Sequence, residues 1–128
     1  MRALLLLLAL LTAGNASAAD PDWPQADAIT IVADEYKFEP GKIELRAGMP
    51  YRLHFENRGK ELHEYNGAAL FAASDLGNPE VLNAERTEIL LHPGERKDLL
   101  IAPKKPGQFA IICPDHDWAG MTGEVVVR

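Results

Sequence analysis

The stretch of sequence that decides both fold and chemistry reads Cys113-Pro114-Asp115-His116-Asp117-Trp118-Ala119-Gly120-Met121. It contains the only cysteine of the chain, followed at short spacing by an imidazole and a thioether. Copper sites of one kind use one Cys, two His and a long, weak bond to Met, so this loop offers three of the four donors. The second His must come from elsewhere in the chain, and the best candidate is His63.

Short strand-like stretches lie on both sides of this loop. Tyr51, Leu53 and Phe55 alternate with polar residues, which is the period of a half-buried strand. Further strands are predicted at 28–33, 42–45, 62–65, 87–91, 97–101, 109–113 and 124–127, separated by Gly and Pro turns. About seven to eight short strands predict an all-β chain folded as a β-sandwich. The stretch from Asn66 to about Ala84 is predicted as a short irregular or helical insertion.

The first residues have the pattern of a secretory signal. A charged start at Arg2 precedes a leucine-rich run and the small residues Ala16-Ser17-Ala18. We predict a signal peptide at 1–18, an extended lead-in at 19–27 and one domain at 28–128, with cleavage after Ala19 or a retained anchor as alternatives. The apolar run is shorter than a membrane span, so the mature chain is expected to be periplasmic or secreted, with no membrane span.

Charge and cysteine content narrow the possible partners. The chain carries 13 Lys and Arg against 19 Asp and Glu, a net charge of −6, and losing Arg2 with the signal makes it −7. Nucleic acid and anionic membranes are therefore poor partners. A single cysteine excludes a disulfide within the chain and leaves a metal thiolate, a nucleophile, an intermolecular bridge or an inert thiol.

Alternative functions for the Cys113–Met121 loop account for fewer of its residues. A nucleophilic Cys113 with His116 as its base gives no role to Met121. Zinc also accepts Cys and His, but a thioether is a poor fourth zinc ligand. Met49 competes with Met121 as the axial donor, although it is more readily explained by packing. The remaining polar candidates are read as solvated side chains: His54, His92, Asp115 and Asp117.

The pattern Cys113-x-x-His116-x-x-x-x-Met121, followed by Gly123-Glu124-Val125-Val126-Val127, resembles the cupredoxins, with the loop spacing of plastocyanin and pseudoazurin. The likeness extends upstream through Phe38-Glu39-Pro40 and Leu53-His54-Phe55-Glu56-Asn57. It implies a Greek-key sandwich that binds one Cu(I)/Cu(II) ion through His63, Cys113, His116 and Met121. The implied protein is a monomer and not an enzyme, and it carries single electrons between redox partner proteins.

One residue departs from the plastocyanin pattern. Plastocyanin-like proteins place Asn after the first ligand His, where it ties the two ligand loops together, and this chain has Glu64. The pair His63-Glu64 resembles periplasmic cupredoxin-like domains, some of them linked to copper handling. The alternative function is therefore a periplasmic copper carrier or buffer.

The resemblance also suggests how electrons would leave the site. His116 is expected to lie nearest the surface and to serve as the electron port. An apolar docking patch of Trp118, Ala119, Gly120 and Phe71 is expected around it, and the net negative charge would steer a basic partner there.

Overall fold

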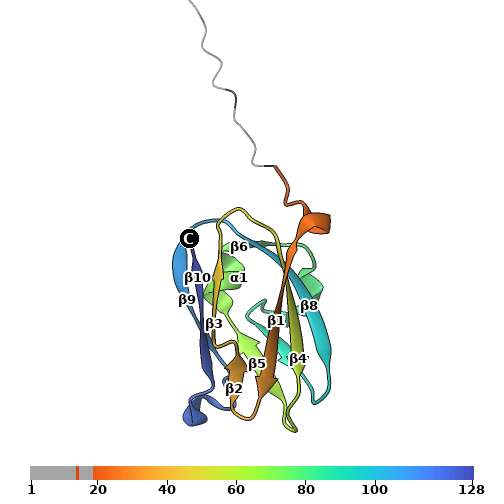
Figure 1. The fold of residues 1–128 in the computed structure, drawn as a ribbon, viewed down its shortest axis with the longest axis vertical. Helices are drawn as coiled ribbons and strands as arrows, with labels where there is room; N and C mark the ends of the chain where they lie inside the picture. Colours follow the sequence, from red (N-terminus) through yellow and green to blue (C-terminus); the bar gives the residue numbers. More distant parts are fainter. Residues whose placement is uncertain (1–13, 15–18) are drawn as a thin grey trace, which may run out of the picture.

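The computed structural model describes residue 14 and residues 19–128, which form a sandwich of two five-stranded sheets (Figure 1). In the first sheet the strand order is β2-β1-β4-β8-β6. These strands are β1 Asp27–Asp34, β2 Lys37–Glu39, β4 Tyr51–Asn57, β6 Ser74–Leu76 and β8 Arg96–Pro103. In the second sheet the order is β3-β10-β9-β5-β7. Its strands are β3 Lys42–Leu45, β5 His63–Asn66, β7 Glu88–Leu91, β9 Gly107–Ile112 and β10 Thr122–Val127.

The predicted all-β sandwich is confirmed, and its described part has ten strands rather than seven or eight. The two strands that the sequence did not resolve, β2 and β6, are each three residues long. Three residues are too few to show an alternation, so such strands are defined only by pairing with a neighbour. β2 pairs with β1, and β6 pairs with β8 at the edge of the same sheet.

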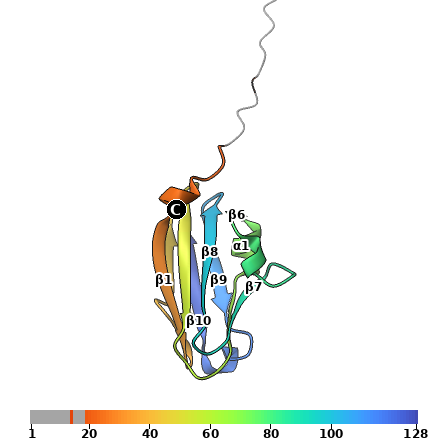
Figure 2. The ribbon, with the colours of Figure 1, turned by 90° about the vertical axis from the view of Figure 1, so that its right-hand side faces the viewer.

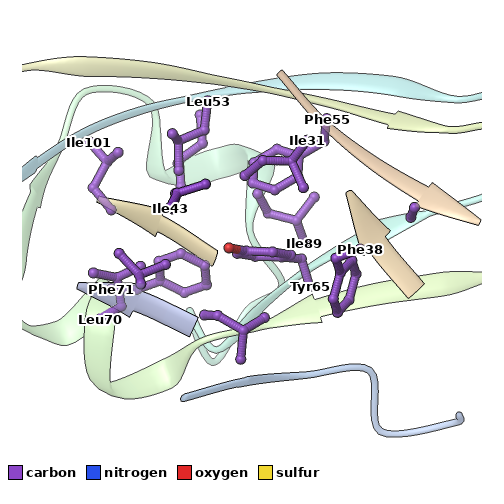
Figure 3. Packing of buried hydrophobic residues seen from close by; sticks show 14 of the residues in the cluster. Ile31, Phe38, Ile43, Leu53, Phe55, Tyr65, Leu70, Phe71, Ile89 and Ile101 are labelled. Carbon is purple, nitrogen blue, oxygen red and sulfur yellow. The ribbon is translucent and has the colours of Figure 1, made fainter. Parts of the chain in front are cut away.

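The alternation in β4 places its apolar face on the core. Leu53 and Phe55 are buried, whereas Arg52 between the core positions is exposed. Figure 3 shows Phe55 and Phe38 beside the ring of Tyr65, with centroid distances of 4.8 Å and 5.0 Å from that ring. Aromatic rings packed at such distances join the two sheets, because Phe55 lies on β4 and Tyr65 on β5.

The insertion between β5 and β7 contains a short helix, α1 Ala68–Ala72, then β6 and the 3-10 helix η2 Pro79–Val81. Leu70 and Phe71 of α1 are buried, and the Ser74 hydroxyl donates a hydrogen bond to the Leu70 carbonyl at 2.7 Å. Figure 2 shows α1 beside β6, at the end of the sandwich away from the β9–β10 loop. The insertion thus covers part of the core without approaching that loop.

The chain enters the fold through a 3-10 helix, η1 Trp23–Gln25, directly before β1. The predicted signal peptide at 1–18 lies outside the described residues apart from Gly14. Across the described part of the chain, no helix is long and apolar enough to cross a membrane.

Three connections gather at the end of the sandwich opposite the C-terminus (Figure 1). They are the β1–β2 turn, the β4–β5 loop and the β9–β10 loop, which contains the 3-10 helix η3 Asp117–Ala119. Residues from distant parts of the sequence therefore meet at this end.

Candidate metal centre

The β9–β10 loop folds back on itself through main-chain hydrogen bonds. The Cys113 amide donates to the Met121 carbonyl at 3.0 Å, and the His116 amide donates to the Cys113 carbonyl at 3.1 Å. Gly120 adopts a positive φ of 78°, a conformation that costs glycine little and lets the chain turn back into β10. The loop backbone therefore brings the three donor residues of the sequence motif together.

His63 reaches the same place from the start of β5. It pairs with Leu91 of β7, and Asn66 at the other end of β5 pairs with Ile112 of β9. The ring centroid of His63 lies 4.9 Å from that of His116. One ligand atom from each of His63, Cys113 and His116 lies within 4.8 Å of the others, and all three side chains are buried.

The surroundings of the two ring nitrogens of His63 indicate that the cluster can bind a metal ion. The residue is fully buried, yet neither Nδ1 nor Nε2 makes a hydrogen bond. Leaving such polar atoms without partners costs on the order of 1–3 kcal/mol each. A metal ion on one nitrogen would remove that cost, so the residues present fit the copper ion expected from the sequence. A thiolate and two imidazoles are donors that copper favours.

The orientation of His116 shows which of its nitrogens faces the cluster. Its Nδ1 lies 3.4 Å from the Cys113 sulfur, and its Nε2 points the other way, 3.3 Å from Oε2 of Glu61. Burial raises the pKa of the Cys113 thiol. Because metals bind the thiolate, an ion in the cluster would release that proton.

Met121 is fully buried and is fixed next to this cluster through its main chain. Met49, the competing thioether, is 45% exposed. Its turn lies at the other end of the sandwich, where the neighbouring Ala47 amide donates to the carbonyl of the C-terminal Arg128. The structure therefore leaves Met121 as the thioether near the cluster and removes Met49 from consideration.

Glu64 takes over the linking role that Asn has in plastocyanin-like proteins. Its carboxylate accepts a hydrogen bond from the Asp115 amide at 3.4 Å and lies 3.5 Å from the Cys113 sulfur. Its own amide donates to that sulfur at 3.5 Å. Burial and the negative charge of Asp115 raise the pKa of Glu64. A single residue thus connects β5 to the cysteine loop.

Two carboxylates at the site were missed by sequence reasoning. Glu35 in the β1–β2 turn has Oε1 3.4 Å from Nε2 of His63, and Glu61 in the β4–β5 loop contacts His116. Desolvation opposes ionisation of Glu35, but hydrogen bonds from the Glu61 and Lys60 amides outweigh it and lower its pKa to about 2. No spacing in the sequence links these residues to the ligands, because only the fold brings the loops together.

His116 is the least buried of the four candidate ligands, as expected, with 9% of its surface exposed. The ring of Tyr36 packs at 4.9 Å from it and at 5.4 Å from Trp118, which is 74% exposed. The expectation for Phe71 is wrong, because this residue is 2% exposed and belongs to α1 at the other end of the sandwich. A local motif could not show this, since the position of α1 depends on the whole fold.

Among the described residues, the other polar candidates do not belong to the His63-Cys113-His116 cluster. His54 on β4 contacts Asp98 and Glu56, and its side chain is 25% exposed. His92, Asp115 and Asp117 are exposed, as predicted.

A two-sheet sandwich with a buried Cys-His-His cluster at one end is the arrangement of a small β domain that can bind a metal ion. The chain belongs to the cupredoxin-like domain family, whose family model matches residues 2–127.

Two curated relatives are copper-resistant cuproproteins named CopI. The protein from Rubrivivax gelatinosus is 30% identical over 105 residues, which cover 77% of this chain and 64% of the relative. The chain thus spans somewhat less than two thirds of that relative's length. The protein from Pseudomonas aeruginosa is 24% identical over 137 aligned positions, covering 79% of this chain and 76% of the relative.

Among solved structures, the fold is similar to that of reduced auracyanin from Roseiflexus castenholzii. The TM-score is 0.61 with 17% sequence identity, and the match covers 80% of this chain and 98% of that one. At this identity the comparison supports the fold, which agrees with the family assignment.

Proposed function

We propose that the protein is a periplasmic or secreted type 1 copper protein that carries single electrons between redox partner proteins. The proposed ligands are His63, Cys113, His116 and Met121. The observation that carries the proposal is the fully buried His63, which has no hydrogen-bond partner and lies beside the Cys113 thiol and the His116 ring.

Copper bound by such donors supplies a one-electron couple between Cu(I) and Cu(II). The contribution of the protein is to hold the donors in place in either state. Cys113, His63 and Met121 are fully buried, and main-chain hydrogen bonds fix both ends of the loop that carries two of them. Such a rigid, dry environment keeps the ligands from rearranging, which favours rapid electron exchange.

The same burial argues against a catalytic role for the cysteine. The Cys113 sulfur is fully enclosed, and its pKa is raised, so a substrate would find neither access nor a ready thiolate. We therefore assign no catalytic residue to the site and propose that the protein is not an enzyme.

The second candidate function is a copper carrier or buffer. It is favoured by the curated relatives, whose names describe copper-resistant cuproproteins. The same four ligands would serve this function, but the ion itself would be the cargo passed to a partner.

An optical spectrum of the copper-loaded mature protein tests the metal site. An intense visible thiolate-to-copper band is expected in the wild type, and it should vanish in Cys113→Ser and weaken or disappear in His63→Ala. His54→Ala and His92→Ala are the matched controls and should keep the band. An intense band in Cys113→Ser would refute the proposed site.

Competition with a Cu(I) chelator then separates the two functions. An electron carrier should retain copper through repeated cycles of reduction and oxidation, whereas a carrier of copper should release Cu(I) to the chelator within minutes. Rapid release together with poor redox cycling would favour the copper-handling function.

A further inference from the structure

We propose that Glu35 is the positioning residue for His63: its carboxylate faces Nε2 and so directs Nδ1 to the metal. This inference rests on the proposed copper site and adds a residue to it from the opposite sheet. Oε1 of Glu35 lies 3.4 Å from Nε2 of His63, an electrostatic contact that does not have the geometry of a hydrogen bond in this structure.

The carboxylate is held in place by several independent contacts. Its Oε1 accepts hydrogen bonds from the amides of Lys60 at 2.6 Å and Glu61 at 2.7 Å. Both amides belong to the loop that leads into His63, so the same oxygen that faces the imidazole also fixes the backbone before it. Only 24% of the Glu35 side chain is exposed.

Gly59 makes room for this arrangement. A Cβ atom at this position would lie 2.5 Å from both oxygens of the Glu35 carboxylate. Such a distance is too short for any non-bonded contact, so a side chain at residue 59 must displace the carboxylate. The loop therefore has a glycine at the position where the Glu35 carboxylate approaches the backbone most closely.

The position of the Glu35 carboxylate next to Nε2 has two consequences for His63 as a metal ligand. A carboxylate next to one ring nitrogen stabilises the tautomer with its proton there, which leaves the lone pair on the other nitrogen. Nδ1 of His116 faces the cysteine in the same way, with Glu61 at its Nε2. A negative charge beside the ring also strengthens the imidazole as a donor, which favours Cu(II) over Cu(I).

The tautomer can be measured without copper. Nitrogen-15 NMR of the metal-free protein, at an alkaline pH where the imidazole is neutral, should show the His63 proton on Nε2. In Glu35→Ala this preference should be lost. A wild-type His63 that carries its proton on Nδ1 would overturn the proposal. Because no metal is present, this result stands even if the proposed function fails.

Copper binding gives the second readout. Glu35→Ala should lower the affinity for Cu(II) by roughly ten- to a hundredfold, the usual effect of removing such a partner. Glu35→Gln keeps an oxygen that can accept from both amides but removes the charge, so it should raise the reduction potential. Its hydrogen bonds to the two amides are weaker than those of the carboxylate, so it should lower the thermal stability of the metal-free protein, but by less than Glu35→Ala does. Failure of the wild type to bind copper would refute the proposed function instead.

Two further variants separate the effect of the position of the Glu35 carboxylate on the reduction potential from the effect of its charge. Gly59→Ala keeps the charge of Glu35 but displaces its carboxylate, so it should also raise the potential. Asp117→Asn removes one exposed charge next to His116 in sequence and should shift the potential less than Glu35→Gln. Equal shifts in Asp117→Asn and Glu35→Gln, or a Gly59→Ala variant identical to the wild type, would overturn the proposal.

Discussion

At the scale of single residues, Asn57 is the buried amide that organises the loop before His63. Its Nδ2 donates to the carbonyls of Glu61 at 2.8 Å and Leu91 at 2.9 Å, and its Oδ1 accepts from the Gly59 amide at 2.8 Å. Only 2% of the residue is exposed, so water cannot replace these bonds readily. One side chain thus connects the β4–β5 loop to β7.

Asn57→Ala is expected to lower the free energy of unfolding by about 2–4 kcal/mol, because it removes one buried hydrogen bond, to the Leu91 carbonyl, and two partly buried ones, to the Glu61 carbonyl and from the Gly59 amide. Urea denaturation of the metal-free protein measures the change. The matched control is Asn66→Ala, a half-buried residue whose amide makes one side-chain hydrogen bond at 3.2 Å, and its cost should stay below about 1 kcal/mol. Equal stability of the two variants would contradict the role given to Asn57.

Met121 should tune the reduction potential without being essential for binding, because a distant thioether donates weakly. Met121→Gln supplies a stronger oxygen donor, so it should stabilise Cu(II) and lower the potential. Met121→Leu removes the donor and should raise it. Voltammetry of both copper-loaded variants checks the opposite signs, and an unchanged potential in both would mean that Met121 does not contact the metal.

The sequence alone predicted those site residues that lie close together in the chain. Cys113, His116 and Met121 share one loop, so their spacing alone indicates a common site. Glu35 and Glu61 could not be predicted, because each belongs to a different connection and contacts its histidine only after the sheets have packed. Contacts of this kind leave no periodic or spacing signal.

At the scale of elements, the long strands leave a local signal in the sequence, whereas the insertion between β5 and β7 depends on tertiary contacts. β4 shows its alternation over seven residues, and the structure buries the expected face. The helix α1 has five residues and no side-chain cap, and its stability comes from burying Leu70 and Phe71. A helix formed by tertiary packing is poorly marked in the sequence, which explains why only an irregular or helical segment was predicted there.

Strand pairing also creates a titrating network on the outer face of the first sheet. Register places His54 of β4 opposite Asp98 of β8. Hydrogen bonds with Asp98 and then Glu56 raise the pKa of His54 above its ordinary value of 6.5. The protonated imidazole is therefore favoured in the folded state.

This pairing should stabilise the protein mainly at mildly acidic pH. Because the folded-state pKa is the higher one, the contribution is complete below about pH 6.5 and is lost as the pH rises through the folded pKa. The difference in unfolding free energy between wild type and His54→Gln should be larger at pH 5.5 than at pH 9. A pH-independent difference would contradict the network, and the copper spectrum should not change because His54 is not a ligand.

At the scale of the whole molecule, the candidate ligands come from one sheet and its loops. Glu35 comes from the β1–β2 turn of the other sheet, and Glu61 comes from the loop that joins the two sheets. The site therefore lies where the two layers meet at one end of the sandwich (Figure 1). An ion bound there contacts residues whose positions depend on the complete fold, so binding and folding should be coupled.

Copper loading should consequently raise the melting temperature of the mature protein. A ligand that binds only the folded state adds about 2.7 kcal/mol at a free concentration a hundred times its dissociation constant. For a domain of about 110 residues, this corresponds to an increase of roughly 10 °C. Calorimetry with and without copper measures the shift, and removal of the metal by a chelator should reverse it. Cys113→Ser is the control, because it keeps the fold but lacks the thiolate, so its increase should be much smaller. An equal increase in the wild type and in Cys113→Ser would place the stabilising ion at a different site.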